Sequence, residues 1–245
     1  MSGRVGSITT EIIADGLIFN MDAANRASTI PSTSTDKAFN TTNLNNSGSL
    51  ENGVLFSNNN SGIWDFDGTD AYIEVESNGN GTIFDTQIFT IQAWFKSDID
   101  PDTVTAEIIW SYDYPSHSSP NYSQHLRLGG AGDSSDEIQF LWNNGSTFKY
   151  INVNGALTGT QTDWHNVAAT YKSGEQKLYL DGSQIGSNTE TGTITYYDQE
   201  VWVGRGNGGW YFNGKIPNIQ FYNRALSANE VLHNYNALKG RFGLS

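Results

Sequence analysis

The sequence predicts an all-β protein, an antiparallel two-sheet β-sandwich with one short C-terminal helix. Runs of about four to eight residues alternate apolar and polar side chains, as strands with one buried face do. Glycine, asparagine, aspartate and serine bound these runs, as expected of turns. Apolar residues recur at helical spacing in one segment, near the C-terminal end of the sequence. These three observations indicate strands joined by turns along most of the chain.

The predicted strands follow one another in chain order. The clearest alternations lie at residues 72–76, 90–96, 138–142, 166–171, 177–181, 201–203 and 219–221. Asp181-Gly182 continues one of these runs and supplies the positive φ angles of a tight hairpin turn. Residues 28–62, with a strand signal at 54–56, and residues 111–124 are rich in small polar residues and turn formers, so we expect loops there.

The predicted helix covers residues 228–238. Ser227 and Glu230 have the spacing of a capping box, and the apolar residues that follow recur at helical intervals. Gly240 is expected to be the C-terminal cap. We therefore predict an N-terminal arm at residues 1–10, one domain at 11–240 and a short tail at 241–245.

Composition excludes several classes of protein. The 13 basic and 26 acidic residues give a net charge of −13, which disfavours nucleic-acid binding because that needs clustered cations. The chain has no cysteine, so disulfide scaffolds and thiolate metal sites are excluded. We expect no membrane insertion, since no apolar stretch approaches about 18 residues. The polar start also lacks the apolar region of a secretory signal.

Five segments resemble the laminin-G-like, concanavalin A-like jelly rolls in order and spacing. They are 66–73 (FDGTDAYI), 89–95 (FTIQAWF), 164–171 (WHNVAATY), 177–182 (KLYLDG) and 213–227 (NGKIPNIQFYNRALS). The resemblance covers about residues 14–235 and implies a lectin-type jelly roll.

The two ends of this region resemble bacteriophage virion proteins of the same family. The segments are 16–25 (GLIFNMDAAN) and 234–242 (NYNALKGRF). The resemblance implies a non-enzymatic virion surface protein, a capsid decoration, fibre or tail component made in the host cytoplasm. Its implied partners are other virion proteins, further copies of itself and host-surface polysaccharide. The alternatives are a free carbohydrate-binding module and, on the same fold, a glycoside hydrolase or lyase.

A calcium site is one of two interpretations of Asp67 and Asp70, which flank a turn. Carboxylates in loops suit hard cations such as Ca²⁺. The other interpretation is an Asx turn in which Asp67 binds its own backbone. The resemblance weakens the calcium interpretation, because Ala71 and the pair Pro217-Asn218 replace acidic residues of the family pattern.

Two aromatic loops are candidates for glycan binding or for a subunit interface. Sugar sites combine aromatic faces with planar polar groups, and tyrosine-rich patches are common at interfaces. The candidates in the first loop are Tyr112, Tyr114, His117, Asn121 and Tyr122. The second loop offers Trp210 and Tyr211, for which the resemblance implies a structural hairpin instead.

Catalysis is not expected from the sequence. Glu74 and Glu76 share a strand face, but the third carboxylate of the spacing used by retaining glycosidases is missing. The four histidines are scattered, and no nucleophile elbow is present. A solvated strand face explains the two glutamates.

Overall fold

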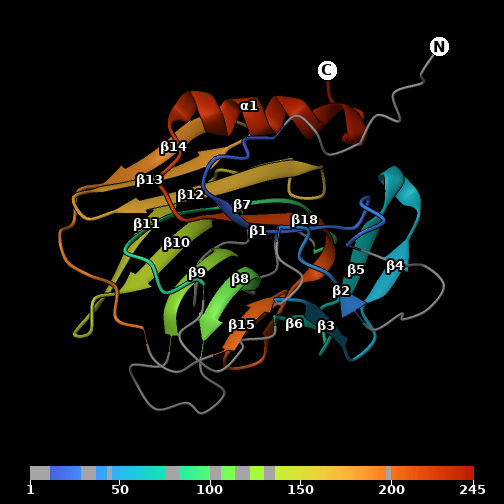
Figure 1. Ribbon diagram of the computed structural model, residues 1–245, viewed down its shortest axis with the longest axis horizontal. Coiled ribbons are helices and arrows are strands. Elements are labelled where there is room, and N and C mark those ends of the chain that lie inside the picture. The colour runs from blue at the N-terminus through green and yellow to red at the C-terminus, as the bar shows by residue number, and fades with distance from the viewer. Residues whose placement is uncertain are drawn as a thin grey trace.

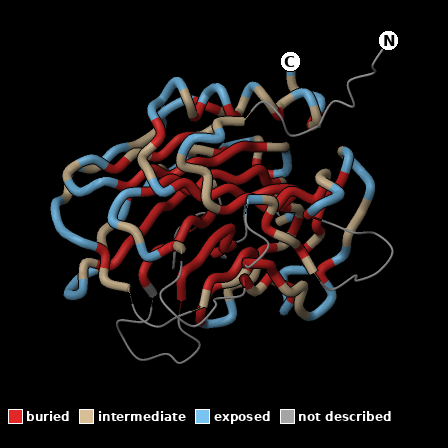
Figure 2. The backbone as a smooth tube through the Cα atoms, viewed as in Figure 1, coloured by how far each residue is buried: buried red, intermediate tan, exposed pale blue. Residues whose placement is uncertain are grey.

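Two antiparallel β-sheets pack face to face, and helix α1 (Ala228–Lys239) covers the outer side of one of them (Figure 1). The computed structural model describes residues 12–28, 37–42, 46–75, 83–99, 106–113, 122–129, 136–196 and 200–245, and of Tyr122 the backbone alone. Buried residues fill the space between the sheets (Figure 2). The predicted all-β sandwich with a C-terminal helix is therefore confirmed.

The first sheet joins strands from both ends of the chain. In spatial order it contains β14 (Ser183–Asn188), β13 (Glu175–Leu180), β12 (His165–Lys172), β7 (Ile88–Ser97), β18 (Asn213–Tyr222), β5 (Ile63–Asp67) and β4 (Leu55–Ser57). β1 (Leu17–Asp22) pairs with the second half of β18, while β5 pairs with its first half. The N-terminal and C-terminal strands thus lie side by side at the centre of the fold.

The second sheet forms the other layer of the sandwich. Its order is β11 (Phe148–Val153), β10 (Ile138–Asn143), β9 (Tyr122–Leu128), β8 (Glu107–Asp113), β15 (Glu200–Val203), β6 (Tyr72–Val75), β3 (Gly48–Glu51) and β2 (Lys37–Ala38). A separate hairpin of β16 (Arg205–Gly206) and β17 (Trp210–Tyr211) contacts β8. Two short 3₁₀ helices, η1 (Asn59–Ser61) and η2 (Gly240–Phe242), complete the described elements.

Aromatic rings hold the two sheets together. Phe84 lies at the centre of the core, with its ring centroid 5.0–5.2 Å from those of Phe19, Trp110 and Phe221. All three contacts are edge-on, the arrangement that the ring quadrupole favours. Trp110 belongs to the second sheet and the other two partners to the first, so Phe84 joins the layers.

Strand β7 is buried on both faces, although its alternation predicts a single buried face. The side chains of Thr90, Gln92 and Trp94 point away from the core and lie beneath helix α1 and the segment before it. Trp94 stacks on Tyr235 and Phe242, with centroid distances of 5.4 and 4.3 Å. The face of β7 that the alternation predicts to be polar is therefore an interface with the helix and its flanking segments.

The helix begins as predicted and ends at Lys239, one residue beyond the expected 238, with Gly240 as its C-terminal cap. Ser227 and Glu230 form the capping box, with the Glu230 amide donating to the Ser227 hydroxyl and the Ser227 amide donating to the Glu230 carboxylate. Gly240 does not terminate the helix in a left-handed conformation, because its φ is −61° and η2 follows directly. Gly243, with a φ of 75°, is the left-handed residue.

Arg241 clamps the C-terminus to the first strand. Its guanidinium donates to the Asp22 carboxylate at 2.7 Å, to the carbonyl of Asn60 at 2.6 Å and to the carbonyl of Gly62. The Arg241 and Asp22 side chains are 7% and 4% exposed. Phe242 is also buried, so part of the expected tail packs against the first sheet.

Residues 28–62 contain more structure than the predicted loop. Strand β2 pairs with β3, β3 pairs with β6, and β4 confirms the strand signal at residues 54–56. These strands are short, and β3 (GSLE) buries its first residue alone while the other three are half-buried. Their pairing at a sheet edge rests on backbone hydrogen bonds, which a side-chain pattern does not reveal.

Glu107 is a buried carboxyl group that links the sheets. It begins β8 in the second sheet and accepts hydrogen bonds from the Ser97 hydroxyl at 2.6 Å and the Asn213 amide at 2.9 Å, both in the first sheet. Burial raises the pKa of Glu107 to about 7, and these hydrogen bonds offset part of that effect.

We predict that Arg241→Ala lowers the free energy of unfolding by about 3–5 kcal/mol, because it leaves the buried Asp22 carboxylate without its partner. Urea unfolding monitored by tryptophan fluorescence measures the loss. The matched control is Arg26→Ala, at an exposed position near the end of β1, which should change stability by less than about 0.5 kcal/mol. Equal effects of the two substitutions would show that the clamp contributes nothing.

We also predict that Glu107 makes the fold less stable as pH rises. The folded protein keeps this proton up to about pH 7, whereas the unfolded chain releases it near pH 4.5, so the free energy of unfolding falls between these values. Glu107→Gln keeps a neutral polar group and should remove this slope, with a gain on the order of 3 kcal/mol above pH 7. Parallel stability curves for wild type and variant, from urea unfolding at several pH values, would contradict the prediction.

Candidate functional site

The outer face of the second sheet carries a continuous cross-strand row of side chains. Strand pairing places eight residues opposite one another in succession, and they are Lys37, Ser49, Glu74, Trp202, Ser111, His125, Leu141 and Tyr150. Residues directly opposite in antiparallel strands have neighbouring side chains. The row is buried at its centre and 56% exposed at Tyr150.

One part of this surface combines carboxylates, aromatic rings and a cation, and we name it the acidic–aromatic face. Its residues are Glu51, Tyr72, Glu74, Glu200, Trp202 and Arg205. The Arg205 guanidinium carbon lies 4.1 Å from the Trp202 ring centroid and 4.5 Å from that of Tyr72. The two rings meet edge-on at 6.3 Å, so both stack against the same cation.

Among the carboxylates of this face, Glu74 has a raised proton affinity. Partial burial raises the pKa of Glu74, and the negative charges of Glu200 and Glu51 raise it further, while Arg205 lowers it. Tyr72 also has a raised pKa, chiefly through burial. Three carboxylates face a single guanidinium here, so the surface attracts hydrogen-bond donors and repels anions.

The β16–β17 hairpin lies against this sheet and orients Arg205. The Ser111 hydroxyl donates to the Arg205 carbonyl at 2.6 Å, and the Asn207 amide donates to the Asp113 carboxylate at 2.7 Å. Asp113 also lies 2.9 Å from His125 Nε2, and both side chains are fully buried. The hairpin is thus attached to β8 through two hydrogen bonds in addition to its own strand pairing.

Trp210 and Tyr211 are half-buried within the hairpin, as the structural alternative predicted. The turn before them uses Gly208 and Gly209 at φ values of 92° and 82°, a conformation that favours glycine. The Arg127 guanidinium lies 5.2 Å from the Trp210 ring centroid. Trp210 therefore packs against the sheet with one face and borders the candidate site.

Tyr112 does not belong to a binding loop, contrary to prediction. It is 1% exposed in β8, and its hydroxyl donates to the Asp85 carboxylate at 2.5 Å. The candidates Tyr114, His117 and Asn121 lie outside the described residues, as does the side chain of Tyr122. Strand β8 ends at Asp113, whose carboxylate accepts the amide of Asn207 in the second loop, so the two predicted loops begin close together.

Asp67 has the geometry of the Asx turn that was the alternative to calcium binding. Its Oδ1 accepts the amides of Thr69 at 2.8 Å, Ala71 at 3.1 Å and Asp70 at 3.2 Å. Desolvation raises the pKa of Asp67, but these amides outweigh it and leave the pKa below its usual value. Three N–H dipoles already neutralise this oxygen, so the turn gives a calcium ion little to gain there.

The described residues contain no group of three or more histidine, aspartate or glutamate side chains arranged to hold a metal ion. Within the same part of the chain, no helix is long and apolar enough to cross a bilayer.

Solved structures of low sequence identity share this architecture. The binding domain of botulinum neurotoxin DC in complex with SialylT superposes with a TM-score of 0.69 and 14% identity, over 92% of this chain and 52% of that one. The chain thus spans about half the length of such neurotoxin domains. A second structure is of botulinum neurotoxin type C, a toxin whose cell entry is described as dependent on two ganglioside molecules. It superposes with a TM-score of 0.68 and 13% identity, over 91% of this chain and 51% of that one.

A whole-domain match comes from an extracellular enzyme of Geobacillus stearothermophilus. Domain 4 of its arabinanase AbnA, in complex with arabinotriose, has a TM-score of 0.65 and 13% identity, over 89% of this chain and 98% of that one. No curated protein sequence matches the chain. The sequence profile described as the concanavalin A-like lectin/glucanases superfamily, laminin G type, matches residues 67–232. The chain therefore belongs to the laminin G family of the concanavalin A-like lectin/glucanases superfamily.

Proposed function

We propose that the protein is a carbohydrate-binding module whose ligand is a neutral glycan held on the acidic–aromatic face. The observation that carries the proposal is the stack of Arg205 on Tyr72 and Trp202, beside Glu74 and the neighbouring charges of Glu51 and Glu200. Sugar hydroxyls are donors and acceptors at once, so they match a guanidinium flanked by carboxylates. The negative surplus disfavours anionic glycans.

The fold comparisons support a binding role. Structures of similar fold include an arabinanase domain in complex with arabinotriose and a neurotoxin whose cell entry depends on gangliosides. Binding rather than catalysis is further supported by how Trp202 is covered, since Arg205 stacks on the ring and Trp202 is fully buried. A ligand would contact the rim of this stack, as in a recognition surface.

We further propose that the module is displayed on a virion surface, together with other virion proteins and further copies of itself. Residues 16–25 and 234–242 support this proposal through their resemblance to phage virion proteins. These distant segments are in contact, because the Arg241 guanidinium donates to the Asp22 carboxylate. Mass spectrometry of purified particles tests the proposal, and absence of the protein from them would refute it.

A second candidate function, glycoside hydrolysis, has one observation in its favour. Glu74 has a raised pKa and lies diagonally across from Glu200, since its direct partner Trp202 is two residues away. An acid with a raised pKa near a second carboxylate is the minimum that hydrolysis requires. Release of reducing sugars from arabinan by wild type, abolished by Glu74→Gln, would establish this function over simple binding.

We predict that Arg205→Gln weakens binding to the recognised neutral glycan about tenfold, roughly 1.4 kcal/mol, because it removes the shared cation of the stack. Affinity electrophoresis and calorimetry with arabinan, xylan and β-glucan measure the change. The matched control, Arg26→Gln, removes the same charge at an exposed site on another segment and should bind as wild type. Binding to none of these polysaccharides, or equal binding by both variants, would contradict the proposal.

A further inference from the structure

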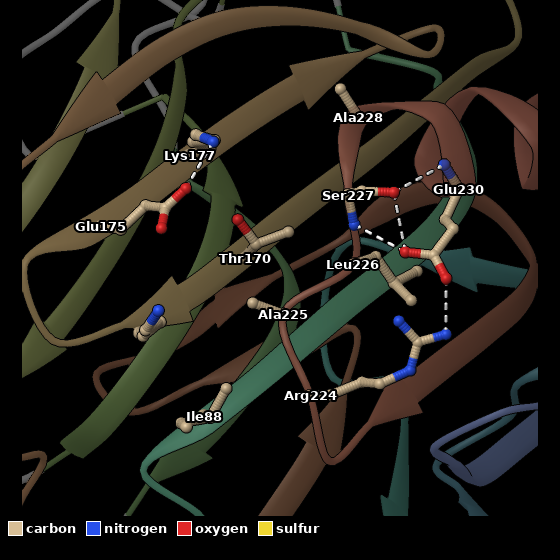
Figure 3. Close-up of a pocket in the computed structure, with 11 residues that line it drawn as sticks. Ile88, Thr170, Glu175, Lys177, Arg224, Ala225, Leu226, Ser227, Ala228 and Glu230 are labelled. Atoms are coloured by element: carbon tan, nitrogen blue, oxygen red, sulfur yellow. Dashed lines mark hydrogen bonds and ion pairs between the residues drawn. The ribbon is translucent and has the colours of Figure 1, made fainter.

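A cavity of about 500 Å³ lies on the outer face of the first sheet, on the opposite side of the sandwich from the acidic–aromatic face (Figure 3). Strands β7, β12 and β13 supply its floor through Ile88, Thr170, Lys172, Glu175 and Lys177. The connection from β18 to α1, residues 224–228, and Glu230 form its wall. This volume lies within the range of small-molecule sites, about 300–1,000 Å³.

Two threonines in one cross-strand row show that the cavity floor has a spare polar group. Thr90 and Thr170 are directly opposite each other on β7 and β12. The Thr90 hydroxyl donates to the Arg224 carbonyl at 2.9 Å and accepts the Leu226 amide at 2.8 Å. Thr170 is equally buried, at 2% exposure, yet its hydroxyl makes no hydrogen bond with the described part of the chain.

The cations around the cavity also differ in whether they have a carboxylate partner. Lys177 pairs with Glu175 at 2.6 Å, and Arg224 pairs with Glu230 at 2.7 Å. Asp15 also pairs with Arg224, at 3.0 Å. Lys172 lies directly across from Glu175 on the neighbouring strand, and among the described residues it is the lining cation that forms no ion pair.

We propose that this cavity binds an acidic monosaccharide, with its carboxylate at Lys172 and a hydroxyl at Thr170. One free ammonium matches a single carboxylate, whereas a phosphate dianion would meet the carboxylates of Glu175 and Glu230 with too little compensation. The Glu175 carboxylate is exposed and pairs with Lys177 through Oε1 alone, so its other oxygen can accept a second sugar hydroxyl. Ile88 and Leu226 provide apolar surface for the C–H face of a sugar ring.

This inference is independent of the neutral-glycan proposal, because the two surfaces lie on different sheets and have opposite charge preferences. Titration of ¹⁵N-labelled protein with D-glucuronate should shift the amide resonances of residues around the cavity in the millimolar range. D-glucose and inorganic phosphate, tested in the same way, should bind at least fivefold more weakly than glucuronate.

Substitutions at the two free groups test the assignment. Lys172→Gln should weaken glucuronate binding at least fivefold, and Thr170→Val, which keeps the shape of the side chain, two- to threefold. Lys96→Gln is the matched control, since it removes the same charge from the same sheet outside the cavity, and it should bind glucuronate as wild type does. Arg205→Gln should also leave glucuronate binding unchanged.

Three results would overturn the inference. They are the absence of glucuronate shifts at the cavity, equal affinity for glucose or phosphate, and equal affinity of the Lys172 and Lys96 variants. Circular dichroism of each variant confirms that it is folded before binding is compared. The Arg205 variant separates the two sites, because loss of both activities there would point to a global effect.

Discussion

One buried side chain, Asn234, joins three distant parts of the chain. Its Oδ1 accepts the amide of Ile13, and its Nδ2 donates to Gln92 and to the Tyr222 hydroxyl, all at 2.8–2.9 Å. Asn234 is 1% exposed, so each of these groups would be left without a partner if the helix moved away. The Gln92 amide donates in turn to Asn166, which extends the network to β12. Helix α1 is thus held in one position on the first sheet by hydrogen bonding as well as by apolar packing.

This constraint makes the two outer faces of the sandwich unequal. Helix α1 covers the first sheet (Figure 1). A cavity lies at its N-terminal end, lined by β12 and by the connection from β18 (Figure 3). In the described part of the chain no helix covers the second sheet, and the short β16–β17 hairpin lies against β8 near its centre. The acidic–aromatic face lies beside that hairpin. The topology therefore provides two chemically different surfaces, one acidic and open and one enclosed by the helix.

The sequence predicts the strands, the capping box and the family well, because each depends on local spacing. Alternation in 90–96 identifies β7, and Ser227 with Glu230 identifies the start of α1. It does not predict that Gln92 and Trp94 are buried, since their cover comes from residues 234–242. Gly240 is the C-terminal cap, as the sequence predicts, but the 3₁₀ turn after it is not predicted, because it depends on the stacking of Phe242 on Trp94.

The candidate site is less visible in the sequence. Glu74 is identified from its alternating strand, but Glu51, Glu200 and Arg205 become its neighbours only through the register of β3, β6 and β15. Tyr112 illustrates the opposite error. Residues 111–124 are rich in tyrosine, serine and proline and therefore resemble a binding loop. The strand nevertheless continues through residue 113, and the ring points into the core. Long-range pairing, which no local pattern encodes, decides both cases.

The Arg241 clamp has a consequence for the timing of folding. It joins residues 219 positions apart, and the Asn234 bonds to Ile13 span 221. During synthesis, β1 and β7 emerge long before β18 and α1, which cover them on the first sheet. Asp22 and the outer face of Trp94 therefore lack their partners until residues 241 and 242 have been synthesised. Such long sequence separations slow folding, so this part of the fold forms only after residues 234–242 have left the ribosome.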